Sequence, residues 1–144
     1  MTGFKEKKVF SSHALMAERV GLLWRDFQSE AEKDFLVSVP LSSTPLPLYS
    51  WVVENALTFE NWEKFKFVLM DEQVEGERVF SYVSTTDKAS YESFARKNFL
   101  DSLEEKTKIR FEVLKPDLQC LNEFDSLVQL KGGFDLLVLA IGAK

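Results

Sequence analysis

Apolar residues recur along the chain with two spacings, one typical of helices and one typical of buried strands. In residues 13–33 they are separated by four, three and four positions, which predicts an amphipathic helix. The positions that set this apolar stripe are Met16, Val20, Leu23 and Phe27. Ser11 and Ser12 precede the stripe and are candidate N-caps, because a serine hydroxyl can accept a hydrogen bond from the first helical turn.

Short apolar runs rich in β-branched and aromatic residues predict the strands of a buried sheet. These runs are residues 34–40, 65–71, 108–114 and 134–142, with a further short strand at residues 7–10. The segments between them predict helices at residues 45–57, at residues 90–103, and through residues 121–130 up to the glycines that follow. This alternation indicates a single α/β domain over residues 1–144, Rossmann-like, with a mostly parallel sheet in a three-layer α/β/α architecture.

Composition and charge narrow the classes of function. The chain has 144 residues, of which 45% are hydrophobic and 28% charged, as in a soluble globular protein. Its net charge of -5 argues against a nucleic-acid or anionic-membrane partner. The sequence shows neither a signal peptide nor an apolar run of membrane-spanning length, so a cytoplasmic location is expected. One histidine and one cysteine provide no metal-ligand spacing, and no cofactor is expected; the cysteine, Cys120, is expected to be buried.

Ligands of parallel α/β sheets bind at the carboxyl ends of the strands, and the first of these ends carries three hydroxyl residues. Ser42, Ser43 and Thr44 lie between an apolar run and the proline that opens a helix. Backbone N–H groups and the helix dipole favour a phosphate or a carboxylate at such a place. The alternative is an ordinary turn in which Thr44 caps the helix.

Two further strand ends carry candidate chemistry. Asp71 follows the second apolar run with Glu72 beside it, and carboxylates at this place suit proton transfer on a bound sugar phosphate. A loop carboxylate that caps the next turn is the alternative. The third end is the last apolar run, which finishes at Lys144.

Four segments in this order resemble the glucosamine-6-phosphate deaminase (isomerase) family, whose fold the 6-phosphogluconolactonases share. "PLSSTPLPLY" is similar to the family's phosphate loop, Pro-Thr-Gly-Gly/Ser-Thr-Pro with a tyrosine four residues later. "FVLMDE" is similar to its strand that ends in Asp-Glu, and "SYESFARKNFLDSL" to its helix Ser-Tyr-x-x-Phe-x-x-x-Asn-Phe. "GGFDLLVLAIGAK" is similar to the strand that leads into its Gly-x-Asp-Gly-His loop. The resemblance covers most of the chain from the first helix onward.

The resemblance implies an isomerase and deaminase of amino-sugar metabolism that acts on glucosamine-6-phosphate or a similar hexose phosphate. Asp71 would move a proton between C1 and C2 of the sugar, and Glu72 would be the second catalytic carboxylate. The residues expected to contact the phosphorylated sugar are Ser42, Ser43, Thr44, Tyr91 and Lys144. No nucleic acid, membrane or metal partner is implied, and a homo-oligomer is compatible with the resemblance.

The chain departs from the family pattern at both ends of the expected site. Ser42 and Ser43 replace glycines of the loop, and Lys144 replaces the aspartate before Gly-His. The family's histidine and its later phosphate-binding residues fall beyond position 144, so we expect residues 1–144 to be the N-terminal part of a longer domain and inactive alone. A 6-phosphogluconolactonase-type hydrolase and a non-catalytic sugar-phosphate-binding protein are the two alternatives.

Overall fold

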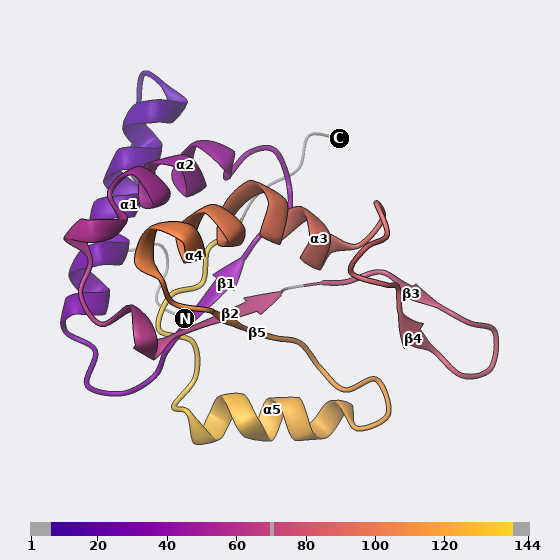
Figure 1. The fold of residues 1–144 in the computed structure, drawn as a ribbon. Helices are drawn as coiled ribbons and strands as arrows, with labels where there is room; N and C mark the ends of the chain where they lie inside the picture. The colour runs from indigo at the N-terminus through magenta and orange to yellow at the C-terminus, as the bar shows by residue number, and fades with distance from the viewer. Residues whose placement is uncertain (1–6, 70, 140–144) are drawn as a thin grey trace.

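A three-stranded parallel sheet forms the centre of the computed structural model, which describes residues 7–69 and 71–139 (Figure 1). Its strands are β1 (Phe35–Val39), β2 (Phe65–Leu69) and β5 (Glu112–Leu114), in the order β1-β2-β5. The register pairs Phe35 with Phe65 and Val39 with Leu69. Because parallel neighbours with this register end together, the carboxyl ends of β1 and β2 lie at one edge of the sheet.

Helices cover both faces of this sheet, as the alternating pattern predicts. On one side lie α1 (His13–Ser29), α2 (Leu46–Glu54) and a continuous helical stretch made of α3 (Tyr91–Ala95), a π-helical turn (Arg96–Leu100) and α4 (Asp101–Thr107). On the other side lies α5 (Leu121–Leu130), which contributes no buried residue (Figure 1). Short 3-10 turns at Ala56–Thr58 and Trp62–Lys64 precede β2. No helix in the described ranges combines the length and apolar content needed to cross a membrane.

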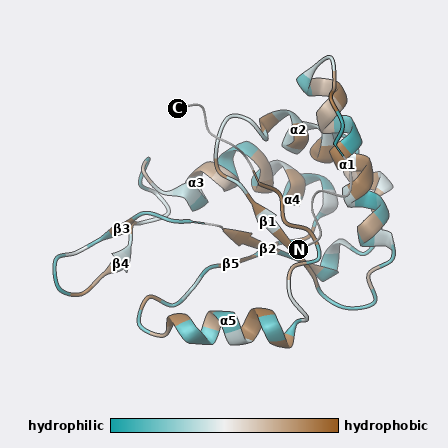
Figure 2. Cartoon of the chain, turned by 180° about the vertical axis from the view of Figure 1, so that it is seen from behind, coloured by the Kyte–Doolittle hydropathy of each residue, from teal (hydrophilic) through white to brown (hydrophobic). Residues whose placement is uncertain are grey.

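An antiparallel arm of two-residue strands, β3 (Val74–Glu75) and β4 (Ser81–Tyr82), extends from the body between β2 and α3 (Figure 1). Figure 2 shows the contrast between the hydrophobic colour of β1 and β2 and the largely hydrophilic arm. A hydrogen bond of 2.6 Å from the Tyr82 hydroxyl to the Pro116 carbonyl ties the arm to the segment after β5. No strand was expected in this polar stretch.

Aromatic side chains fill the space between the sheet and the larger helical layer. Trp24 of α1 is completely buried, and its ring centroid lies 6.1 to 6.3 Å from those of Phe65, Phe67 and Phe99. Aromatic pairs at such distances add to the free energy that burial alone contributes. The core therefore joins α1, β2 and the π-helical turn into one unit.

The buried residues of α1 are shifted by one position along the chain from the predicted apolar stripe. Its buried residues are Ala17, Gly21, Trp24 and Gln28, whereas Phe27 is 50% exposed. A Cβ atom on Gly21 would lie 2.1 Å from the Trp51 ring, so the helix backbone itself packs against α2. The buried face thus combines two small residues, Ala17 and Gly21, with the large ring of Trp24. The predicted N-cap is confirmed, since the Ser12 hydroxyl accepts a hydrogen bond from the Leu15 N–H.

The segment predicted as the last strand runs parallel to β1 but forms only one bridge, between Leu136 and Val37, within residues 134–139. Two side chains also form hydrogen bonds between this segment and β1, in places where a regular strand would use backbone groups. The Asp135 carboxylate accepts the Leu36 N–H at 2.9 Å, and the Ser38 hydroxyl accepts the Val138 N–H at 2.7 Å. Residues 140–142 of the predicted strand lie outside the described residues.

Three smaller expectations are corrected. The described part of the predicted N-terminal strand, residues 7–10, has no regular structure. Of the predicted strand at residues 108–114, only the last three residues pair as a strand, and Lys108 instead ends α4 in the left-handed region with φ 60°. Cys120 is exposed rather than buried, at the start of α5.

Candidate functional site

Three chain segments leave the sheet at the same edge. Val39 pairs with Leu69, and the bridge between Val37 and Leu136 places residues 138–139 beside the end of β1. Neighbouring strands lie about 4.8 Å apart, so positions 39 and 69, at the ends of β1 and β2, are close neighbours. The structure therefore brings the predicted hydroxyl loop and Asp71 to one edge. Lys144 lies outside the described residues.

The loop between β1 and α2 presents several donors without protein partners. The N–H groups of Ser42, Ser43 and Thr44 donate no hydrogen bond to any described residue. The Ser42 hydroxyl is buried and also has no partner within the described ranges. An unpaired buried hydroxyl is costly, and such a group is normally satisfied by a water or a ligand. These groups form a donor-rich loop that fits an anion.

The alternative of an ordinary capped turn does not describe this loop. No side chain caps α2, so Thr44 is not its N-cap, and the cap position is held by Pro45. Pro47 in the first turn has no N–H either, as with any proline. The donors that an anion could use therefore come mainly from the loop and less from the first turn of α2.

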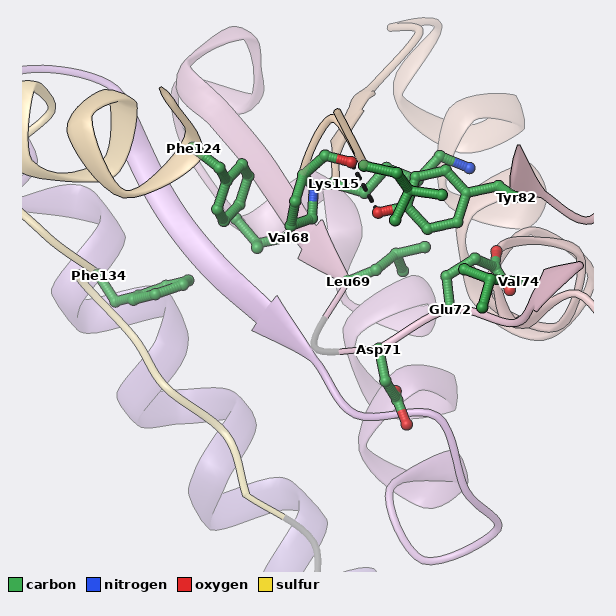
Figure 3. A pocket seen from close by; sticks show the side chains of 11 residues that line it. Val68, Leu69, Asp71, Glu72, Val74, Tyr82, Lys115, Phe124 and Phe134 are labelled. Carbon is green, nitrogen blue, oxygen red and sulfur yellow. Dashed lines mark hydrogen bonds between the residues drawn. The ribbon is translucent and has the colours of Figure 1, made fainter. Parts of the chain in front are cut away.

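Asp71 is exposed at the edge of the sheet, next to the end of β2. Figure 3 shows that its carboxylate points away from Glu72 and Tyr82. No hydrogen bond or ion pair of this side chain is formed with another described residue. Among the described residues, therefore, no side chain or backbone group occupies its oxygens.

Glu72 has a different environment, although it is the next residue. Its Oε1 accepts the N–H groups of Gln73 and Tyr91, at 2.8 and 2.7 Å. Its Oε2 accepts the Glu92 N–H at 2.9 Å and the Ser90 hydroxyl at 3.0 Å. Burial raises the pKa of this carboxyl, but the four hydrogen bonds outweigh burial and hold the pKa below its ordinary value. Glu72 is therefore an ionised cap of α3, which corresponds to the alternative considered for a carboxylate at this place.

An ionic cluster continues from α3 to β5. The Glu92 carboxylate contacts Lys115 Nζ at 2.8 Å and Arg96 Nε at 3.2 Å. Lys115 Nζ also lies 4.6 Å from the centroid of the Tyr82 ring, within cation–π range. Burial and the negative charges of Glu72 and Asp117 raise the pKa of the Tyr82 phenol. The arm, α3 and β5 are thus joined at their meeting point.

A cavity of about 260 Å³ lies beside this cluster, at the end of β2 (Figure 3). Lys115, Tyr82 and Glu72 supply polar lining groups, but each already has a protein partner. The apolar part of the lining is contributed by Val68, Leu69, Val74, Leu118, Phe124 and Phe134. Asp71 also lines this cavity, and unlike the other three polar residues it forms no hydrogen bond or ion pair with a described residue. The hydroxyl residues 42–44 do not line the cavity.

Tyr91 is the first residue of α3, and the hydrogen bond from its N–H to Glu72 places it near the sheet edge.

Tyr49 and Lys115 were not predicted as site residues from the sequence. Tyr49 donates a hydrogen bond to the Pro40 carbonyl, directly before the hydroxyl loop. The signal for Tyr49 was its place four residues after Pro45, and for Lys115 its place directly after a strand. Within the described ranges, no three His, Cys, Asp or Glu side chains form a group that could hold a metal ion.

Comparison of the chain with known proteins and solved structures identifies its fold. No protein-family model matches the chain, and no curated protein does. A similar solved structure is that of a monomeric glucosamine-6-phosphate deaminase, described as a missing link of the NagB superfamily, with a TM-score of 0.70 and 18% identity. The match covers 92% of this chain and 54% of the other, so the chain spans about half the length of that structure. At this identity the likeness establishes the fold, which is the glucosamine-6-phosphate isomerase-like α/β fold predicted from the sequence.

Proposed function

We propose that the chain binds a phosphorylated sugar at the edge formed by the loop after β1 and by Asp71, and that its domain catalyses isomerisation and deamination of an amino-sugar phosphate such as glucosamine-6-phosphate. One observation carries the proposal. Three loop N–H groups and the buried Ser42 hydroxyl, none of which has a partner among the described residues, leave the sheet at the same edge as an exposed carboxylate. A donor-rich loop suits a phosphate, and a carboxylate next to it suits proton transfer at the sugar carbons.

The proposal assigns one role to the loop residues and one to each of the two carboxylates. Ser42, Ser43 and Thr44 hold the phosphate and so fix the position of the sugar. Asp71 removes the proton from C2 of the open-chain sugar and returns it at C1, which leaves an imine at C2. Water then adds to C2 of this imine and ammonia leaves, so that the product is the ketose phosphate. Glu72 is a positioning residue, because its four hydrogen bonds hold the start of α3 and with it Tyr91 near the substrate.

The proposal also concerns how much of the functional domain residues 1–144 make up. The neighbouring deaminase is nearly twice as long as the matched region, since only 54% of it is covered. Exposed apolar residues on α5 and on the last described segment, such as Leu130 at 86% and Leu139 at 70%, also fit a surface that further chain covers. We propose that residues 1–144 are the N-terminal part of a family domain and that turnover needs the remainder.

The test combines binding with turnover. Glucosamine-6-phosphate is expected to raise the melting temperature of the chain, whereas glucosamine without phosphate is not. In the full-length protein, release of ammonia and fructose-6-phosphate is measured, and Asp71→Asn is expected to lower kcat by roughly 10²- to 10⁴-fold. Unchanged turnover after Asp71→Asn would remove Asp71 from the mechanism, and no stabilisation by any hexose phosphate would remove the site.

A second function is favoured by the composition of the loop. Ser42 and Ser43 occupy places where the resemblance expects glycines, and their side chains restrict how closely a phosphate approaches the backbone. A non-catalytic sugar-phosphate binder is stabilised by hexose phosphates but releases no ammonia. A 6-phosphogluconolactonase-type hydrolase is identified instead by acid release from 6-phosphogluconolactone.

A further inference from the structure

Tyr49 connects the hydroxyl loop to the core of the protein. Its side chain is 1% exposed, and its hydroxyl donates a hydrogen bond of 2.5 Å to the carbonyl of Pro40. Pro40 is the first residue after β1 and lies two positions before Ser42. Burial raises the pKa of the Tyr49 phenol, so the hydroxyl keeps its proton and acts as a donor.

The ring of Tyr49 is held as firmly as its hydroxyl. It stacks on Phe99 with a centroid distance of 4.6 Å and an interplanar angle of 17°. Phe99 is completely buried within the π-helical turn Arg96–Leu100. The helical stretch that contains this turn starts at α3, which Glu72 caps directly beside Asp71. Tyr49 therefore contacts the helical stretch whose first turn Glu72 caps, as well as the loop proposed to hold the phosphate.

The hydrogen bond to Pro40 restrains the start of a loop that has few other hydrogen bonds to described residues, one of them from the Leu46 N–H to the Ser43 carbonyl. Ser42, Ser43 and Thr44 donate no hydrogen bond from their N–H groups to described residues, and no side chain caps α2. The direction of the Pro40 carbonyl sets the plane of the peptide that begins the loop. A fixed carbonyl thus reduces the number of directions in which the next N–H groups can point, and recognition by preorganised groups binds more tightly.

We propose that Tyr49 is a positioning residue for phosphate recognition, which orients the N–H groups of residues 42–44 through its hydrogen bond to Pro40. This inference rests on the proposed function, because it assumes that the loop binds the phosphate. It adds a residue that does not touch the ligand and that acts through the Pro40 carbonyl.

The test compares Tyr49→Phe with the natural chain. Phenylalanine keeps the ring and its stack on Phe99 and removes only the hydroxyl. The dissociation constants of glucosamine-6-phosphate and of inorganic phosphate are measured by calorimetry, at a temperature where circular dichroism shows both proteins folded. Both constants are expected to rise about five- to tenfold, the effect of one lost hydrogen bond.

Trp62→Phe is the matched control, because it also removes a buried hydrogen bond to a carbonyl. Trp62 Nε1 donates to the Ala56 carbonyl at 2.7 Å, and Trp62 lies before β2, at the opposite end of the strand. Its substitution is expected to lower stability and to leave phosphate affinity unchanged. Equal weakening in Trp62→Phe and Tyr49→Phe would overturn the positioning role.

The outcomes separate the two proposals. If the natural chain binds neither probe, the proposed function fails. If the natural chain binds both probes and Tyr49→Phe binds them equally well, the positioning role fails alone. A second readout uses no variant, in case Tyr49→Phe does not fold: saturating phosphate is expected to slow exchange of the Tyr49 hydroxyl proton by the same five- to tenfold, since coupling is reciprocal. Unchanged exchange would contradict the inference.

Discussion

Replacing Glu72 with glutamine tests whether this carboxylate is a helix cap. A glutamine has one oxygen in place of two, so it can still accept the N–H groups of Gln73 and Tyr91. Its NH₂ faces the Ser90 hydroxyl, which can rotate to accept from it, and the Glu92 N–H, which cannot. One hydrogen bond to a charged acceptor is then lost and one donor is left unpaired, each worth about 1.5–3 kcal/mol. Because the side chain is only half-buried, we expect the free energy of unfolding to fall by about 2 kcal/mol.

The assay is urea unfolding followed by tryptophan fluorescence, with Glu75→Gln as the control. Glu75 is exposed in β3, and its substitution is expected to change stability by less than about 0.5 kcal/mol. For Glu72→Gln, a loss of about 2 kcal/mol corresponds to roughly 4–8 °C in melting temperature for a chain of this size. A Glu72→Gln protein as stable as the Glu75→Gln control at pH 7 would refute the capping role.

The pH dependence of the same comparison has a defined sign. The folded-state pKa of Glu72 lies below its ordinary value of 4.5, because the folded state stabilises the charged form. The stabilisation is therefore fully present above pH 4.5 and is lost as the pH falls through the lower, folded-state pKa. The difference between the natural chain and Glu72→Gln should stay constant from neutral pH down to about 5 and shrink below it. A difference that grows toward low pH would contradict the assignment.

Two further substitutions test the packing around the sheet. Gln28→Met is expected to stabilise the protein by about 1–2 kcal/mol, because the buried amide of Gln28 has no partner among the described residues and methionine has a similar shape; thermal unfolding measures this, and a loss of stability would show that the amide is satisfied. Ser38→Ala is expected to cost about 2 kcal/mol, since it leaves the Val138 N–H without its acceptor. Hydrogen exchange at Val138 should accelerate, and unchanged protection would show that the segment is held by other contacts.

The strands β1 and β2 could be predicted because their signals are local. β1 and β2 are continuous apolar runs, and residues buried on both faces of a parallel sheet leave this pattern in the sequence. The arm β3–β4 could not be predicted, because its strands are two residues long and mostly exposed. Its position depends on the contact between Tyr82 and Pro116, 34 residues apart.

The roles of individual residues depend on contacts that no short segment contains. The buried residues of α1 lie one position along the chain from the predicted stripe, and the close contact between Gly21 and Trp51 that accompanies this shift has no signal in the helix sequence alone. Asp71 and Glu72 were indistinguishable as neighbouring carboxylates. They differ in the structure because α3 returns 18 to 20 residues later and presents its donors to Glu72.

The central claim, that the loop after β1 is a phosphate site, is tested most directly by mapping where phosphate binds. Backbone amide resonances of the chain are recorded by nuclear magnetic resonance during titration with glucosamine-6-phosphate and with inorganic phosphate. The amides of Ser42, Ser43 and Thr44 are expected to shift together with both ligands, because their N–H groups become donors to the phosphate. Resonances at residues 121–130 are expected to stay in place. Saturable shifts elsewhere with no change at residues 42–44 would contradict the account.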